Sequence, residues 1–532
     1  MLRLSNLSVP LDYTEADLQA FVLRKFKIPA GRLRRVVLSK RSVDARDKGD
    51  VHFVVSLDAD VRDEDEVLRR MKPGTVNKVA SKAAKPLPKP GFARPPVVVG
   101  AGPAGLFAAL MLARAGAKPV LIERGKPVDE RTLDVSALQA DGVLDSESNV
   151  QFGEGGAGAF SDGKLTTGIK SPWQSVVLET FVQHGAPEEI LYLQKPHIGT
   201  DKLKGVVASI RNEIIALGGD VRFSTKLTGL IVRGEHIEGV RVQSGDSEQE
   251  LLTDTVLLCI GHSARDTIQA LFNQGVVMVQ KPFAMGVRIE HPQSLINRSQ
   301  YGRFADHPAL KAADYKLAVH TPDGRGVYTF CMCPGGEVIA AASQHGGVAV
   351  NGMSYHARAG RNANAALLVG VRTEDFGDDH PLSGFVLQRS LEQAAFRVGG
   401  GDYHAPVQRV EDLLAGRATK RLGDVEPTYK PGVTPADLRE CLPSFIIDDL
   451  KFGVTQMDRQ LRGYAHPDAV LTGVETRSSS PVRLTRGDTL MAEHFDGLFP
   501  VGEGAGYAGG IVSAAVDGIN AAYAALERSS VL

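Results

Sequence analysis

The chain has few of the features that mark secreted, disulfide-bonded or membrane-spanning proteins. It contains four cysteines in 532 residues, at positions 259, 331, 333 and 441, and no CxxC pair. So few cysteines exclude a disulfide framework and argue against a metal ribbon or a thioredoxin-type pair. No apolar run approaches the 18 residues of a membrane span, and the N-terminus lacks a basic segment followed by an apolar one. These absences predict a protein of the reducing cytoplasm that does not enter membranes.

The net charge and the absence of common catalytic motifs exclude several classes of function and assign none. The net charge of −1 creates no strong field toward nucleic acid or an anionic membrane. HExxH, Walker and Ser-His-Asp patterns are absent, and the spacing of His345 and His356 is not that of metal ligands, so no metal is predicted. The basic surplus of residues 1–94, which hold 20 Lys and Arg against 12 Asp and Glu, is better explained by a solvated face and a linker than by an acidic partner.

The first 90 residues predict a small basic α+β domain with its linker. Apolar residues alternate or recur at helical spacing in five segments, and Thr14 is a plausible helix cap. The expected strands are 2–9, 33–38 and 51–57, and the expected helices are 14–26 and 64–71. This order resembles a ferredoxin-like sandwich. Residues 72–96 mix Lys, Pro, Ala and Gly without hydrophobic period, which is linker composition.

A dinucleotide-binding turn follows this linker. The apolar strand 97–99 leads into Gly100-Ala-Gly102-Pro-Ala-Gly105, and a helix at 106–115 and a strand at 119–122 come next. Gly100 permits the tight turn, Gly102 lets main-chain amides reach a pyrophosphate, and Gly105 lets the helix lie close to the sheet. Glu123, at the end of the second strand, is placed to accept hydrogen bonds from an adenosine ribose. The whole pattern favours a dinucleotide site over an ordinary glycine turn.

A second glycine-rich motif near the C-terminus indicates that the dinucleotide site binds FAD rather than NAD. Residues 497–511 read GLFPVGEGAGYAGGI and precede an apolar helix of about 15 residues. They resemble the second FAD motif of the glutathione-reductase superfamily, in which a Gly-acid pair holds the ribityl chain and a helix N-terminus faces the flavin. Glu503 stands where those families usually have Asp. Such a helix dipole would stabilise negative charge on the reduced flavin.

Further segments resemble a large bacterial family of FAD-dependent dehydrogenases. They are the glycine-rich loop 149–165, together with Glu123-Arg124-Gly125 and Arg131, and the segments 331–336, 351–354 and 399–406. With the two FAD motifs they extend from residue 97 to about 523. The resemblance implies an α/β fold with a discontinuous Rossmann-type FAD domain, at 91–280 and 470–532. A mixed α+β cap or substrate domain would be inserted at 281–469, but the resemblance brings no reaction with it.

The candidate cofactor contacts come from these motifs and from the strand ends near them. Gly261 and His262 follow a strand at 255–259 and resemble the segment where a sheet strand ends beside FAD. The loop 153–164 is expected to cover the isoalloxazine ring, because such glycine density suits a close approach to a cofactor. The residues expected to contact FAD are Gly100, Gly102, Pro103, Ala104, Gly105, Glu123, Arg124, Arg131, Gly155, Gly156, Ala157, Gly158, Ser161, Asp162, Gly163, Lys164, Leu227, Gly261, Gly502, Glu503, Gly509, Gly510 and Ile511.

Candidate catalytic residues are Lys164, His262, His404, Cys331 and Cys333. Each histidine can handle protons near neutral pH, and each can equally be structural. Cys331 and Cys333 are two apart on a predicted strand and should face the same side. They can be a flavin-linked dithiol, but a disulfide so short would be strained and buried Cys often packs as a small hydrophobe. Packing is therefore the favoured interpretation.

The sequence predicts an FAD-dependent oxidoreductase that transfers hydride or electrons through flavin N5, with NAD(P)H as a possible transient donor. Only one complete dinucleotide fingerprint is present, which argues against a disulfide-reductase layout. An RNA-modifying flavoenzyme is the first alternative, although the basic N-terminal domain lacks an aromatic RNA-recognition motif. A non-enzymatic flavoprotein sensor or scaffold is the second. The expected partner is a small-molecule substrate or electron acceptor.

Overall fold

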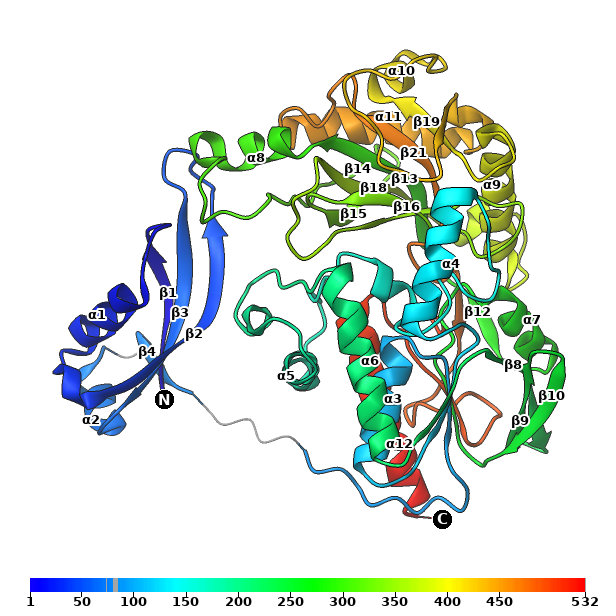
Figure 1. Ribbon diagram of the computed structural model, residues 1–532, viewed down its shortest axis with the longest axis horizontal. Coiled ribbons are helices and arrows are strands. Elements are labelled where there is room, and N and C mark those ends of the chain that lie inside the picture. Colours follow the sequence, from blue (N-terminus) through cyan, green and yellow to red (C-terminus); the bar gives the residue numbers. More distant parts are fainter. Residues whose placement is uncertain (73, 80–84, 532) are drawn as a thin grey trace.

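The computed structural model describes residues 1–72, 74–79 and 85–531. Its N-terminal part is a four-stranded antiparallel sheet in the order β2-β3-β1-β4, with two helices on one face (Figure 1). Strand and helix order is the βαββαβ pattern of a ferredoxin-like sandwich. Its elements are β1 (Leu2–Val9), α1 (Glu15–Phe26), β2 (Leu33–Asp44), β3 (His52–Val61), α2 (Glu64–Arg70) and β4 (Val76–Lys78).

Two details of this domain bear on the sequence predictions. Thr14 caps α1, and its hydroxyl and main-chain amide exchange hydrogen bonds with Asp17 in a capping box. Strand β4 lies within the segment predicted to be a plain linker, because a lone Val76 gives no periodic signal but pairs with Leu4 of β1. Part of that predicted linker, residues 80–84, lies outside the described residues.

The second unit is a five-stranded parallel sheet in the order β23-β11-β5-β6-β7. Strand β23 comes from the C-terminal end of the chain, so segments almost 400 residues apart share one sheet. Its elements, with the neighbouring antiparallel sheet β8-β9-β10, are β5 (Val97–Val99), α3 (Pro103–Arg114), β6 (Val120–Ile122), α4 (Val128–Asp141), α5 (Trp173–Gln183), α6 (Thr200–Ala216), β7 (Asp220–Arg222), β8 (Thr225–Arg233), β9 (His236–Ser244), β10 (Ser247–Leu252), β11 (Val256–Leu258), α7 (Arg265–Asn273), β23 (Leu498–Pro500) and α12 (Ile511–Ser529).

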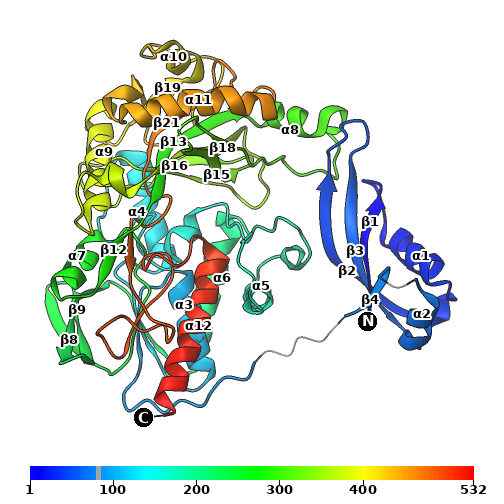
Figure 2. The same ribbon diagram turned by 180° about the vertical axis from the view of Figure 1, so that it is seen from behind.

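Helices cover one face of this parallel sheet. Figures 1 and 2 show α3, α6 and α12 side by side, and a common core joins them to the sheet through residues such as Leu110, Ile210 and Ile519. Helix α3 carries buried residues on every side because it is enclosed by the sheet and by both other helices. This packing fixes the N-termini of α3 and α12 at one edge of the sheet.

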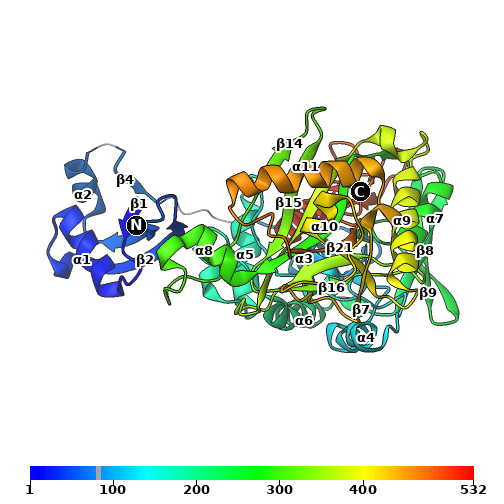
Figure 3. The same cartoon turned by 90° about the horizontal axis from the view of Figure 1, so that it is seen from above.

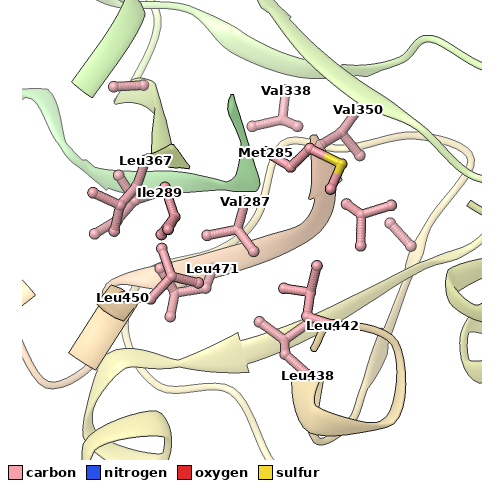
Figure 4. Close-up of a cluster of buried hydrophobic side chains, with 14 of the residues drawn as sticks. Met285, Val287, Ile289, Val338, Val350, Leu367, Leu438, Leu442, Leu450 and Leu471 are labelled. Carbon is pink, nitrogen blue, oxygen red and sulfur yellow. The ribbon is translucent and has the colours of Figure 1, made fainter. Parts of the chain in front are cut away.

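The third unit is a seven-stranded sheet in the order β14-β15-β18-β13-β21-β19-β20. Strands β13 and β18 are buried almost throughout, and Figure 4 shows Met285, Val287 and Leu367 of these strands in the core with Leu450 of α11. Its elements are β13 (Phe283–Pro292), α8 (Gln293–Tyr301), β14 (Ala318–His320), β15 (Gly326–Cys333), β18 (Asn362–Val371), α9 (Ser383–Gly399), β19 (Ala405–Arg409), α10 (Val410–Ala415), β20 (Val433–Pro435), α11 (Ser444–Gln460) and β21 (Val470–Glu475). Two separate two-stranded sheets are formed by β12 (Met278–Gln280) with β22 (Val482–Leu484) and by β16 (Glu337–Ala340) with β17 (Val350–Met353).

The N-terminal domain is set beside the rest of the molecule and touches it through the β2–β3 end of its sheet (Figure 3). Arg41 of β2 exchanges main-chain hydrogen bonds with Tyr192 and Gln194, at 2.7 and 2.9 Å. Phe304 and Leu310 of the third unit pack against its core. Within the described part of the chain, no helix is long and apolar enough to cross a membrane.

Candidate functional site

A cavity of about 320 Å³ lies at the carboxyl ends of β5, β6, β11 and β23, where it meets the third unit. Ligands of open parallel sheets bind at this edge. Its near end is formed by the glycine turn after β5 and by the N-termini of α3 and α12. Its far end is formed by side chains of β15, β17 and β21, such as Cys331, Asn351 and Glu475. The cavity therefore lies between the five-stranded parallel sheet and the seven-stranded sheet, whose lining residues are far apart in the sequence.

The three fingerprint glycines have different roles in this geometry. Gly100 has φ of 101°, and a Cβ there would lie 2.4 Å from the Cys259 carbonyl oxygen. A Cβ on Gly105 would lie 1.8 Å from the Gly100 oxygen, so Gly105 packs the turn and does not line the cavity. A Cβ on Gly102 would meet nothing closer than the Gly156 Cα at 3.9 Å. Gly102 is therefore the position at which a side chain would enter cavity space.

Glu123 organises the near end through its main-chain contacts. One carboxylate oxygen accepts hydrogen bonds from the amides of Gly125 and Gly153, both at 2.9 Å, and the other accepts from Ala101 at 2.7 Å. A carboxylate has about four lone-pair sites, so one remains for a ribose hydroxyl. Glu123 lines the cavity as predicted and also ties three loops together.

Arg131 does not line the cavity, although the sequence suggested a cofactor contact. Its fully buried guanidinium donates hydrogen bonds to four carbonyl groups of the glycine-rich loop, at 2.6 to 3.3 Å. Those carbonyls belong to Asn149, Val150, Gly153 and Glu154. Burial without a directly bonded carboxylate lowers the pKa of Arg131 to about 10. The residue holds the loop that lines the cavity, rather than the ligand.

The C-terminal motif contributes the opposite wall, from the N-terminus of α12 at the near end to Glu503, which stands where the near end meets the far end. Glu503, Gly509, Gly510 and Ile511 line the cavity, and Gly502 lies just outside it. The Gly502 amide instead donates to the Asp517 carboxylate at 2.7 Å. No side chain caps the N-terminus of α3 or of α12 in the described structure, so the first amides of both helices are free for an anionic ligand.

Lys164 and its surroundings form one side of the far end. The Lys164 ammonium lies 3.6 Å from the buried Asp162 carboxylate, which Arg358 holds through two hydrogen bonds of 2.6 and 2.9 Å. Although burial opposes the charge, Asp162 raises the pKa of Lys164 above its ordinary value. Lys164 and Ser161 line the cavity, whereas Asp162, Gly163 and Gly155 lie behind its wall. The ammonium therefore remains charged beside the cavity.

Cys331 and Cys333 do not face the same side, contrary to the prediction from strand alternation. The pairing of β15 with β18 is irregular between Phe330 and Cys333, and Cys331 has φ of 41°. This bulge turns Cys331 to the cavity, while Cys333 is fully buried and does not line it. The Cys333 thiol donates to the Cys331 carbonyl oxygen at 3.2 Å.

Of the two histidine candidates, only His262 lies at the cavity. His262 lines the cavity, but burial and the cations Arg477 and Arg265 lower its pKa to about 3, so it is neutral near pH 7. Its Nε2 lies 3.6 Å from a Glu503 oxygen. Burial raises the pKa of Glu503 to about 7, which makes Glu503 the group that changes protonation near neutral pH. His404 does not line the cavity and instead pairs with Asp402 at 2.7 Å.

The structure brings together most of the predicted cofactor contacts and adds others. Besides those already placed, the cavity lining includes the predicted Gly100, Gly102, Pro103, Ala104, Arg124, Gly156, Ala157, Gly158, Leu227 and Gly261. The sequence reasoning missed the far-end residues Gln151, Thr166, Ser263, Phe330, Asn351, Glu475, Arg477 and Ser478. Gln151, Ser263 and Asn351 stood in or beside recognised motifs but were not singled out, and the others come from strands and loops without a sequence signal.

Several solved structures resemble the chain at low similarity. CtdE in complex with FAD is 12% identical with a TM-score of 0.32, and the alignment covers 82% of this chain and 87% of that one. A geranylgeranyl bacteriochlorophyll reductase-like protein from Thermoplasma acidophilum is 13% identical with a TM-score of 0.34, covering 83% and 79%. The E. coli quinol fumarate reductase FrdA is 13% identical with a TM-score of 0.36, covering 82% and 70%.

Family models and a sequence relative match the chain more directly. A model described as "FAD-dependent protein, C-terminal domain-like" matches residues 282–478, and an "FAD binding domain" model matches residues 95–139. A domain of unknown function matches residues 1–60. A Clostridium beijerinckii protein described as "Uncharacterized protein" is 47% identical over 531 residues, 99% of each chain. The chain therefore belongs to the family of this Clostridium beijerinckii protein, and it is a flavoprotein whose cofactor is FAD.

Proposed function

We propose that the chain is an FAD-dependent oxidoreductase, a dehydrogenase or reductase that passes hydride or electrons through flavin N5 to or from a small-molecule substrate. The observation that carries this proposal is the cavity with two unlike ends. Its near end consists of glycine turns and free helix N-termini, which suit a dinucleotide. Its far end consists of charged and polar side chains, which suit a reacting molecule.

The residues of the near end fit FAD. Gly102 leaves open space at the N-terminus of α3, where the pyrophosphate would lie on main-chain amides. Glu123 keeps one acceptor site for the adenosine ribose, and Glu503 follows β23 at the position expected for the ribityl chain. Arg124 and Lys226 line the same wall, where each pairs with the carboxylates of Glu147 and Asp266. When bound, FAD accepts and returns a hydride or single electrons, which side chains do not do.

The far end would bind, orient and protonate the substrate. The Lys164 ammonium and the Arg477 guanidinium line it and suit an anionic or strongly polar substrate group. The Glu503 carboxyl, with its pKa near 7, can hold a proton and release it to a neighbouring atom. His262 stays neutral beside that carboxyl, with its Nε2 3.6 Å from a Glu503 oxygen. Covering this end with the seven-stranded sheet would limit the access of water.

The electron donor is proposed to be a nicotinamide nucleotide that binds transiently. Only residues 97–123 carry the complete dinucleotide fingerprint of strand, GxGxxG turn, helix, second strand and terminal acid, because the GxGxxG spacings at 153–158 and 504–509 lack the second strand and its acid. A donor nucleotide therefore has no second Rossmann domain of its own. It would have to approach the flavin through the same opening as the substrate. Such an enzyme works in two half-reactions that share one site.

A spectrum of the purified protein followed by anaerobic reduction tests this function. We expect flavin absorbance, release of FAD rather than FMN on denaturation, and bleaching by NADH or NADPH. Reoxidation by an added acceptor would then separate an enzyme from a flavoprotein sensor or scaffold. Protein that keeps FAD but is reduced by neither nucleotide would refute the nicotinamide donor. A flavin that no donor and acceptor pair turns over would refute the enzyme itself.

A further inference from the structure

The backbone of β15 is distorted at one residue, and this residue faces the cavity. Cys331 occupies the left-handed region at a β-bulge, with φ of 41°. For a residue other than glycine such a conformation is strained, and it is retained mainly where it positions a functional group. Bulges beside active sites redirect a side chain in the same way. The distortion here places the Cys331 side chain in the cavity wall and leaves Cys333 behind it.

The surroundings of Cys331 stabilise a thiolate. The adjacent Cys333 thiol, together with the charges of Lys164 and Arg288, lowers the pKa of Cys331 well below its ordinary value, against the opposing effects of burial and Asp162. Arg288 is fully buried and donates to the Cys331 carbonyl oxygen at 3.0 Å.

Cys259 provides an internal contrast. It lines the same cavity, but burial raises its pKa above the ordinary value. The two cysteines therefore differ in protonation. The one cation near Cys259, Arg486, is opposed by the Asp517 carboxylate, whereas Lys164, Arg288 and the Cys333 thiol act together on Cys331. The thiolate is the reactive form of cysteine, so the environment singles out Cys331.

Two hydrogen-bond donors line the same cavity as Cys331. Asn351 lines the cavity, and its side-chain oxygen accepts hydrogen bonds from Arg288 at 3.1 Å and from the Gly352 amide at 2.8 Å. Because both partners can only donate, the oxygen must face them and the NH₂ group is left to donate elsewhere. The Lys164 ammonium also lines the cavity, and its buried Nζ has no hydrogen-bond partner in the described structure.

We propose that Cys331 is a nucleophile for the carbonyl carbon of an aldehyde substrate, with Asn351 and Lys164 as donors to the carbonyl oxygen. The thiolate sulfur forms a bond to the carbon, the π pair of the C=O bond moves to the oxygen, and the two donors stabilise the resulting oxyanion. Collapse of the adduct returns the aldehyde and the thiolate, so this step needs no oxidant. Two donors for one oxygen beside a thiolate favour a carbonyl over an alkyl or disulfide electrophile.

This proposal deepens the proposed function and rests on it, because the adduct would hold the substrate carbon in the cavity that FAD occupies. The test uses the full chain with FAD bound, iodoacetamide as the alkylating probe and propionaldehyde as the carbonyl probe. Peptide mass spectrometry measures the alkylation rate of each cysteine between pH 5 and 9. The groups facing Cys331 that titrate or carry charge are Lys164, Asp162, Arg288, Cys333, Glu475 and Glu503.

We expect Cys331 to be alkylated at pH 6 at least tenfold faster than Cys259 and than Cys441, a buried cysteine outside the cavity. Propionaldehyde should slow the alkylation of Cys331 with saturation and leave Cys441 unaffected. Lys164→Met should move the pH profile of alkylation upward. Asn351→Ala should weaken the protection by aldehyde about tenfold, the loss of a hydrogen bond to a charged group.

Alkylation of Cys331 no faster than that of Cys259, or a rate that aldehyde does not change, would overturn the proposal. These readouts require no turnover and no variant, so they apply to the wild-type chain even if a variant fails to fold. Flavin absorbance and reduction by NADH or NADPH are recorded on the same samples. A flavin that is reduced while Cys331 is inert refutes this proposal alone, and a reactive Cys331 beside a flavin that is never reduced refutes the proposed function alone.

Discussion

The two ends of the cavity are built by different means. The near end consists of main chain: glycines, helix N-termini and a glutamate that binds three amides. The far end consists of side chains, with the buried Arg288–Glu475 pair beneath it at 2.6 Å and Cys331, Lys164 and Asn351 facing inward. A main-chain site is fixed by local conformation, whereas the far end depends on charges that balance only in the folded protein. The near end therefore indicates the cofactor, and the far end is where the reaction is decided.

Filling the near end should have the largest effect. In Gly102→Val a side chain enters space that the protein does not use, so FAD binding should be lost while the chain stays folded. Flavin absorbance and circular dichroism of the purified variant measure both quantities. Gly105→Ala is the opposite control, because its Cβ would collide with the Gly100 oxygen and should unfold the turn. A yellow Gly102→Val protein would contradict the placement of the pyrophosphate.

Removing the buried positive charge of Arg288, beneath the far end, should have a smaller effect than the loss of FAD binding. It should still lower the free energy of unfolding by several kcal/mol. Arg288→Met leaves the buried Glu475 carboxylate without its partner, which is expected to lower the free energy of unfolding by about 3–5 kcal/mol. Arg222→Met, which removes an exposed pair with Asp220, should cost less than about 1 kcal/mol. Urea unfolding of both variants makes the comparison. Equal losses would show that the far end does not depend on buried charge.

The stability of the far end should depend on pH through Glu503. Burial raises the pKa of Glu503 from 4.5 to about 7; the negative charge of Cys331 adds to this shift and the positive charge of Lys281 opposes it. Between these two pH values the folded protein therefore keeps a proton that the unfolded chain has already released. The free energy of unfolding should fall by about 3 kcal/mol as pH rises from 4.5 to 7. Glu503→Gln should remove this part of the pH dependence. Unfolding curves at pH 5 and 7.5 that fall equally in both proteins would rule it out.

Removal of the N-terminal domain should leave the near end nearly unchanged. All predicted FAD contacts lie beyond residue 97, so a chain of residues 91–532 should keep its flavin. Its contacts with the rest, such as Arg41 with Tyr192, lie away from the described cavity lining. The flavin content of the truncated and full chains gives the result. An apo or insoluble product would show that the domain is integral to the fold.

The smallest effect is expected for RNA. The basic residues of the N-terminal domain are partly neutralised within it, as Arg3 is by Asp58 and Arg32 by Glu66. Gel-shift titration with tRNA should therefore show no shift at physiological salt. A shift that weakens steeply with added salt would instead favour the RNA-modifying alternative.

The sequence predicted the near end because its determinants are local. The strand, the glycine turn and the helix at 97–114 follow one another, and the Thr14 capping box lies within four residues. The far end was largely missed for the opposite reason. Strands β13 and β18 are buried on both faces and show no alternation, so their pairing leaves no periodic signal.

Two predictions show where local rules fail. The period of two predicted that Cys331 and Cys333 share a face, but the bulge in β15 separates them. Arg131 was expected at the cofactor, yet it holds four carbonyls of the glycine-rich loop. In both cases the outcome depends on partners distant in the chain. Neither a bulge opposite β18 nor the path of a loop around a guanidinium is visible in spacing alone.

The sequence by itself determined that the chain holds a dinucleotide and where it does so, because glycine spacing and strand order act over a few residues. Only the tertiary structure decided which side chains share the far end. Lys164, Cys331, Asn351, Glu475 and Glu503 come from five separate segments. The four of them that titrate, all except Asn351, acquire shifted pKa values only when folding buries them together. Long-range packing sets these electrostatic interactions, so they cannot be inferred from any one segment.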